Sequence, residues 1–178
     1  MTKSIAQPLS RSDIRSMAYF IRKITKQENE LFFDIVKFLD VELPKIDPEF
    51  SLIIDNKHVL GECHGLTYPD RNEIHIRDDV YERAYRKSGR DRLTMAHELF
   101  HLLQHTKENI SYARIDNESA IEKFRDPEWQ ADAFGGELLI PRHLVYNMEV
   151  PEIIEKCKVS SAAAYTQVKA MRYVKKFT

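Results

Sequence analysis

The segment Ala96-His97-Glu98-Leu99-Phe100-His101 places two histidines four positions apart, with a glutamate directly after the first. In an α-helix this spacing puts His97 and His101 on one face, with Glu98 beside them. The neighbouring residues are mostly apolar, which is typical of a helix that is buried nearly all round and predicts a helix over 90–106. Because each unpaired buried polar group costs about 1–3 kcal/mol, these three side chains need partners. A helical H-E-x-x-H pattern is typical of a single catalytic zinc ion that is bound by the two histidines, with the glutamate as general base.

A third metal ligand is expected downstream, since catalytic zinc usually takes three protein ligands and leaves one position for water. We favour Glu128, because it lies in the first turn of a helix predicted to begin at Asp126-Pro127. Asp132 follows one turn later on the same face and could accept the outer ring N–H of a ligating histidine. An ordinary acidic first turn, which the helix dipole favours, would look the same in sequence. The acidic candidates considered were Glu118, Glu122, Asp126, Glu128, Asp132 and Glu137.

Composition excludes several other classes of protein. The chain has 178 residues, is 43% hydrophobic and carries a formal net charge of −1, so no overall field attracts nucleic acid or a membrane. No run approaches the length of a membrane span, and the N-terminus lacks a hydrophobic signal core. The two cysteines, Cys63 and Cys157, form no CxxC motif, so we expect reduced thiols in a cytoplasmic protein.

Periodicity along the rest of the chain predicts an α+β fold, with a helical core around a small, mostly antiparallel three-stranded sheet. Ser10 followed by Asp13 is typical of a helix start. Residues 107–125 show no strong core pattern and are expected to be irregular and partly helical. The other predicted helices cover 11–26, 28–40 and 127–139, and the predicted strands cover 51–55, 59–68 and 73–77.

The tail, residues 142–178, has the pattern of a helix-turn-helix around Pro151–Ala164. It carries seven lysines and arginines but only three glutamates, so it could read DNA. We favour a helical subdomain that packs on the core and presents a solvated basic face.

The run HELFHLLQH (97–105), followed by EWQADAFGGELLIP (128–141), resembles the ImmA/IrrE family of zinc metallopeptidases. That family has an AHELGH-type helix followed by a helix of the form E-x-x-A-N-x-F-A-x-x-L-L-x-P. Ile74-x-Ile76 also resembles the strand that precedes the family's active helix. Three positions depart from the pattern: Phe100 stands where glycine is common, Asp132 where asparagine is usual, and Gly135 where alanine is usual.

The resemblance implies a zincin-like domain over 1–141, with His97, His101 and Glu128 as zinc ligands and Glu98 as general base. Such a reaction also needs a group that stabilises the oxyanion, usually a tyrosine, histidine or arginine. His64, Tyr68, Tyr112 and His105 are candidates, and nothing in the sequence selects one. For His105 we favour a hydrogen-bonding role over direct metal binding. The strand Glu73-Ile74-His75-Ile76 could bind an extended peptide by edge addition, unless it is an interior strand.

Three functions fit these features. The first, which the resemblance implies, is a cytoplasmic zinc endopeptidase acting on a protein, with a helix-turn-helix repressor as the expected substrate. The second is a transcriptional regulator or stress sensor that binds DNA or a repressor without cutting it. The third is a toxin–antitoxin or phage-type partner protein with residual metal binding. The intact Glu98 favours catalysis, because a site that only binds metal would not need it.

Overall fold

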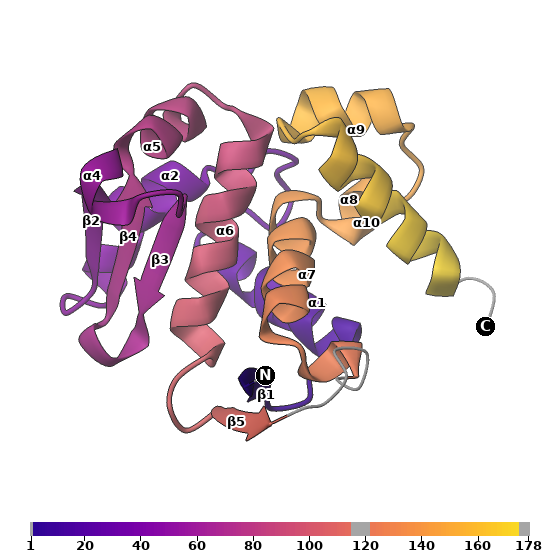
Figure 1. The fold of residues 1–178 in the computed structure, drawn as a ribbon. Coiled ribbons are helices and arrows are strands. Elements are labelled where there is room, and N and C mark those ends of the chain that lie inside the picture. The colour runs from indigo at the N-terminus through magenta and orange to yellow at the C-terminus, as the bar shows by residue number, and fades with distance from the viewer. Residues whose placement is uncertain (1, 115–121, 175–178) are drawn as a thin grey trace.

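The computed structural model describes residues 2–114 and 122–174, and it confirms the predicted α+β fold. Helix α6 (Gly89–Gln104) carries the histidine motif and packs against α7 (Pro127–Leu139), which packs in turn against α1 (Arg11–Ile24). Figure 1 shows a small sheet on one side of α6 and the C-terminal helices on the other. The motif therefore lies in the middle of the fold, where three groups of elements meet.

Helix α1 begins where the capping pair predicted. The Ser10 hydroxyl accepts from the Asp13 amide at 3.2 Å, and the Asp13 carboxylate accepts from the Ser10 amide at 2.9 Å. Two N–H groups that a helix start leaves unpaired are thereby satisfied. The buried face of α1 contributes Ile14, Ala18 and Ile21 to the core.

The predicted helix at 28–40 is displaced toward the C-terminus. The helical segment runs through α2 (Ile35–Lys37), a π-helical turn (Phe38–Glu42) and α3 (Leu43–Ile46). Asp34 caps its start by accepting from the Lys37 amide at 3.2 Å. Pro44 lies inside the segment rather than ending it, because proline is tolerated in the first turn of a helix and α3 begins one residue before it. The short helix α5 (Asp78–Tyr85) then precedes α6.

The three-stranded sheet has the order β2-β4-β3 and is mixed. Its strands are β2 (Ser51–Asp55), β3 (Gly65–Tyr68) and β4 (Glu73–Arg77), with β4 parallel to β2 and antiparallel to β3. The predicted strand at 59–68 forms only in its second half. Asn56 accepts from the amides of His58 and Val59, which starts the short helix α4 (Lys57–Leu60) instead. A 3₁₀ turn, Pro69–Arg71, connects β3 to β4.

A second, two-stranded sheet was not predicted. Strand β1 (Thr2–Ala6) pairs antiparallel with β5 (Ile110–Arg114), within the segment expected to be irregular. Each strand is short and mixes polar with apolar residues, and its partner lies about a hundred residues away, so neither has a strong local signal. The predicted helical character of 107–125 is limited, among the described residues, to a 3₁₀ turn at Lys123–Arg125.

The tail forms α8 (Arg142–Val145), α9 (Val150–Cys157) and α10 (Ser161–Val174). Its buried residues, among them Ile153, Cys157 and Ala164, belong to the same hydrophobic cluster as α6 and α7. Residues 175–178 of the predicted tail lie outside the described part. Among the described residues, none of the helices combines the length and the apolar run that a membrane crossing requires.

Candidate metal centre

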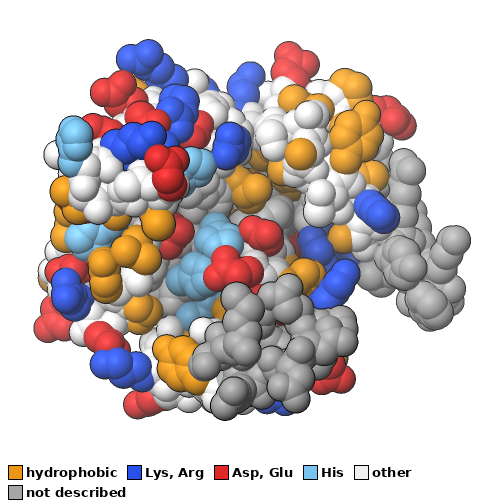
Figure 2. Space-filling model, viewed as in Figure 1, with side chains coloured by type: hydrophobic (Ala, Val, Ile, Leu, Met, Phe, Trp, Pro, Cys, Tyr) orange, Lys and Arg blue, Asp and Glu red, His pale blue; other side chains and the backbone are white. Residues whose placement is uncertain are grey.

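Two helices bring three predicted ligands together. His97 and His101 project from α6 and Glu128 projects from the first turn of α7, and one donor atom of each lies within 4.8 Å of the others. The two Nε2 atoms are 2.9 Å apart, and the Glu128 carboxylate lies 3.3 Å from His97 Nε2 and 3.6 Å from His101 Nε2. Figure 2 shows the histidine and acidic side chains gathered in a hollow at the middle of one face. The three side chains therefore converge at the surface, where a small ligand can reach them.

The outer nitrogen of each histidine has its own partner. His97 Nδ1 lies 2.9 Å from Asp132 Oδ1, so the carboxylate accepts that N–H. His101 Nδ1 lies 2.7 Å from His105 Nδ1, and His105 Nε2 lies 2.9 Å from Gln130 Oε1. These partners leave both Nε2 atoms facing the centre. Asp132 and His105 thus occupy the supporting positions that the sequence analysis favoured for them.

The orientation of the Gln130 amide fixes which ring nitrogens of His105 and His101 carry a proton. Its amide nitrogen donates to the carbonyls of Gln7 and Phe124 at 2.8 and 2.7 Å, so its oxygen must face His105. His105 therefore donates through Nε2 and accepts through Nδ1. His101 then donates through Nδ1, and its Nε2 carries a lone pair toward the centre.

The carboxylates around the centre favour a positive charge on His97. Burial alone would lower the pKa of His97, but hydrogen bonds to Asp132 and Glu128 outweigh it and raise the pKa to about 10. Burial and the neighbouring His97 and His105 lower the pKa of His101. The hydrogen bond from His97 lowers the pKa of Glu128, which is therefore a carboxylate. Two ring nitrogens and a carboxylate around one point are the donor set that catalytic zinc takes, so these residues fit the metal.

Glu98 is buried next to this cluster. Its carboxylate accepts from the Thr67 hydroxyl at 2.7 Å. Burial raises the pKa of Glu98, and the Thr67 hydrogen bond and the charge on His97 oppose this only in part. A Cβ atom at Gly65 would lie 2.7 Å from Glu98 Cγ, so glycine lets β3 approach the glutamate. Sequence reasoning missed Gly65 and Thr67, because only the position of β3 against α6 shows their role.

The four candidates for oxyanion stabilisation lie in different places. His64 lines a pocket of about 250 Å³ together with His97, Glu98 and Asp132. Tyr68 packs edge-on against His75 at a centroid distance of 5.0 Å. Tyr112 is exposed on β5, and His105 lies behind His101. Of the four, His64 is the one that lines the pocket.

The prediction that residues 73–76 bind a peptide by edge addition is wrong, because their strand lies inside the sheet. Strand β4, which contains Glu73, Ile74, His75 and Ile76, is the central strand and is paired on both sides. Ile74 and Ile76 are fully buried, and His75 lies 2.5 Å from Asp55 through Nδ1. Strand β3 lies beside Glu98 and is paired on one side only within this sheet.

The departures from the family pattern have local explanations. Phe100 is fully buried and packs on Phe134 at 4.8 Å between centroids, so it does not narrow the pocket. A Cβ atom at Gly135 would lie 2.8 Å from Leu93 Cδ1, so glycine allows α6 and α7 to approach closely.

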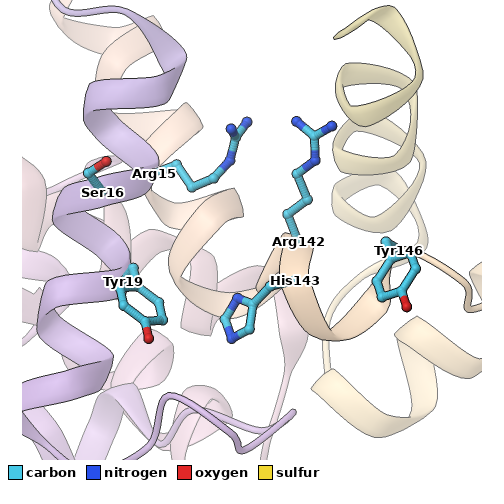
Figure 3. A pocket seen from close by; sticks show the side chains of 6 residues that line it. All are labelled: Arg15, Ser16, Tyr19, Arg142, His143 and Tyr146. Carbon is cyan, nitrogen blue, oxygen red and sulfur yellow. The ribbon is translucent and has the colours of Figure 1, made fainter. Parts of the chain in front are cut away.

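A larger pocket, of about 680 Å³, lies between α1 and α8. Figure 3 shows the side chains of Arg15 and Arg142 extending in the same direction, above Tyr19 and His143. Among the described residues, this pocket shares no lining residue with the pocket of the metal centre, so it is a separate feature of the molecule.

Comparison with family models identifies the family of the chain. No curated protein matches the chain. The family model for the M78 peptidases, described as the IrrE N-terminal-like domain, matches residues 62–170. The match spans β3, α6, α7 and most of α10, and it therefore includes every residue of the proposed centre. The chain belongs to the M78 family of peptidases, the ImmA/IrrE family.

Proposed function

We propose that this protein is a zinc-dependent endopeptidase that hydrolyses a peptide bond in a protein, with a helix-turn-helix repressor as the expected substrate. The observation that carries the proposal is the convergence of His97 Nε2, His101 Nε2 and the Glu128 carboxylate beside a buried glutamate. Membership of a peptidase family supports the same reaction class.

The roles of the residues follow from their positions. When bound by His97, His101 and Glu128, zinc would supply a Lewis acid that lowers the pKa of water and polarises the scissile carbonyl. Glu98 accepts the proton of the attacking water and passes it to the leaving amine, for which its raised pKa is suited. Thr67 holds the Glu98 carboxylate in place, and His64 is the pocket residue available to stabilise the oxyanion.

The substrate would lie along β3. An extended peptide can pair with an unpaired strand side, and β3 has strand β4 on one side only among the described residues. Gly65 and Thr67 of this strand contact Glu98, so a peptide paired there would pass the proton acceptor. The role first assigned to β4 therefore moves to β3.

The deciding experiment compares the wild type with Glu98→Gln. We expect both to bind one equivalent of zinc, measured by elemental analysis, because Glu98 is not among the converging ligand atoms. Only the wild type should cleave a candidate helix-turn-helix repressor chosen from the neighbouring genes, assayed by mass spectrometry. Cleavage by Glu98→Gln at the wild-type rate would contradict the mechanism.

Two controls separate this proposal from a metal-binding regulator. His101→Ala should lose both zinc and cleavage. A gel-shift assay with the full chain should detect no DNA binding, since α9 and α10 are packed on the catalytic core. Specific DNA binding together with no cleavage would favour the non-proteolytic alternative.

A further inference from the structure

A second pocket lies next to the pocket of the metal centre. It has a volume of about 520 Å³ and lies between α6, α7 and α10. Arg90, Leu93 and Asp132 line both this pocket and the smaller one that contains His97 and Glu98. Asp132 is also the residue that hydrogen-bonds His97. The second pocket is therefore within reach of a side chain of a peptide held at the centre.

The apolar part of the lining consists of small residues around one large ring, while Arg90 and Asp132 lie on the side shared with the metal centre. Leu93 comes from α6, Trp129 and Ala133 come from α7, and Ala163 comes from α10. Gly136 lines it too, and a Cβ atom there would lie 3.0 Å from Gln167 Oε1. Small residues on two facing helices leave space that a larger side chain would fill, and a pocket of this size accepts a bulky group.

The polar groups at the α1 side of the pocket are already paired. Arg11 donates to Glu137 at 2.9 Å and to Gln167 at 2.5 Å. Gln167 is itself buried and donates to the carbonyl of Ile140 at 3.4 Å. A charged ligand group would gain no free partner among these three side chains and would lose its hydration. This side of the pocket therefore favours an apolar occupant.

The fold fixes the width of the pocket. A Cβ atom at Gly89 would lie 2.3 Å from the backbone of Val159 and Ser160, so α6 touches the turn that leads into α10. Arg92 of α6 also donates to the carbonyl of Cys157, at 2.8 Å. These contacts hold α10 against α6, so the pocket is formed before a substrate arrives.

We propose that this pocket, which we call the apolar subsite, receives a bulky apolar side chain of the substrate: leucine, methionine or phenylalanine. The side chain belongs to a residue at one fixed position close to the scissile bond. The assignment of the occupant as part of a substrate rests on the proposed peptidase function. The chemistry of the subsite can be measured without any cleavage.

The chain offers a direct probe, because Trp129 is its one tryptophan and lines the subsite. N-acetyl-leucinamide should change the Trp129 emission saturably, whereas N-acetyl-aspartamide should not. Ala163→Phe, which fills the subsite, should abolish the response to leucinamide. Lys169→Phe adds the same ring to the same helix, at an exposed position outside the subsite, and should keep the response. No saturable change, an equal response to both amides, or a response that survives Ala163→Phe would overturn the inference.

Cleavage profiling of a proteome-derived peptide library tests the substrate assignment. The wild type should prefer a bulky apolar residue at one position near the cut. Ala163→Phe should shift that position toward glycine, alanine or serine by roughly tenfold or more, and leave the other positions unchanged. Thr166→Leu, a smaller change at an exposed residue of the same wall, should shift the profile in the same direction and serves if Ala163→Phe folds poorly.

The two experiments separate the subsite from the peptidase function. If leucinamide binds as expected and the library is not cut, the subsite stands and the proposed function fails. If the library is cut with the same profile by the wild type, Ala163→Phe and Thr166→Leu, the function stands and the subsite assignment fails.

Discussion

The two buried arginines and the metal centre hold their charged groups in opposite ways. Arg22 donates to the carbonyls of Leu138, Gln27 and Glu30, at 2.7, 3.0 and 2.5 Å. In the metal centre, by contrast, two histidines and a glutamate face one another and share a single point.

Arg92 follows the same rule as Arg22. It is 1% exposed and donates to the carbonyls of Phe33, at 2.6 Å, and of Cys157 and Lys158. Burial lowers the pKa of each arginine to about 10, which still leaves both charged at neutral pH. Both arginines connect segments far apart in the sequence. The comparison shows that carbonyl-bound charge holds the fold together, whereas converging acidic and basic groups prepare a site for a cation.

The largest effect we expect is on the arginine side of this comparison. Arg92→Met keeps an apolar stem but leaves the three carbonyls without their donor. We expect a loss of about 3 kcal/mol in the free energy of unfolding, measured by urea denaturation. Lys156→Met, at an exposed position on α9, should change it by less than about 0.5 kcal/mol. A loss below about 1 kcal/mol for Arg92→Met would mean that water replaces the guanidinium at little cost.

On the side of the metal centre, the change should appear in zinc affinity rather than in stability. Asp132→Ala removes the acceptor of the His97 N–H, and we expect zinc to bind about 10- to 100-fold more weakly, measured by chelator competition. Asp132→Asn keeps an acceptor at the same place and should stay within about threefold of the wild type. Equal losses in both variants would show that the charge of Asp132 matters more than its hydrogen bond.

The shared helix face of His97 and His101 could be predicted because its information is local, whereas the approach of Glu128 depends on the packing of α7 against α6. His97, Glu98 and His101 lie within one and a half turns of one helix, and an Asp-Pro pair marks the start of the helix that carries Glu128. The Asp126 side chain does accept from the Glu128 amide at 3.0 Å, as an N-cap should. For such residues, helix geometry alone fixes which side chains share a face.

The remaining features depend on contacts that no local pattern encodes. The pairing of β1 with β5 joins Ala6 to Ile110, and the role of β4 depended on whether it was an edge or a central strand. Arg22 and Arg92 look in sequence like ordinary surface residues of amphipathic helices, and only the carbonyls brought in by other segments make their burial possible. The support of Glu98 by Thr67 likewise spans 31 positions of sequence.

The hydrogen bond from Thr67 to Glu98 leads to a prediction about the catalytic rate, with a smaller expected effect. Thr67→Val keeps the shape of the side chain but removes the hydroxyl that donates to Glu98. We expect kcat to fall about tenfold, with zinc content and KM unchanged, because a hydrogen bond to a charged group contributes about 1.5 kcal/mol. Thr67→Ser keeps the hydroxyl and should restore most of the rate. A similar loss in both variants would indicate that the methyl group, rather than the hydrogen bond, positions the glutamate.

The smallest effect concerns an ion pair at the start of α6, where Arg83 donates to Asp91 at 3.0 and 2.9 Å. Burial raises the pKa of Asp91, but hydrogen bonds from Arg83 and Ser88 outweigh it and lower the pKa below its usual value; Arg90 acts in the same direction. A carboxyl group with a lowered pKa in the folded state stabilises the protein above its unfolded pKa of about 3.9. This stabilisation is lost as the pH falls through the lower pKa that Asp91 has in the folded protein.

Arg83→Gln should therefore lower the free energy of unfolding by about 1 kcal/mol at pH 7, because the arginine is half-exposed and solvent screens the pair. The difference from the wild type should shrink as the pH falls below about 4, where Asp91 becomes protonated first in the unfolded chain and then in the folded one. Urea denaturation at both pH values measures this, with Arg86→Gln, an exposed residue paired to Glu82 at 3.8 Å, as the control. A difference that stays constant with pH would show that Arg83 contributes through packing alone, unlike the charged groups of Arg22, Arg92 and the metal centre.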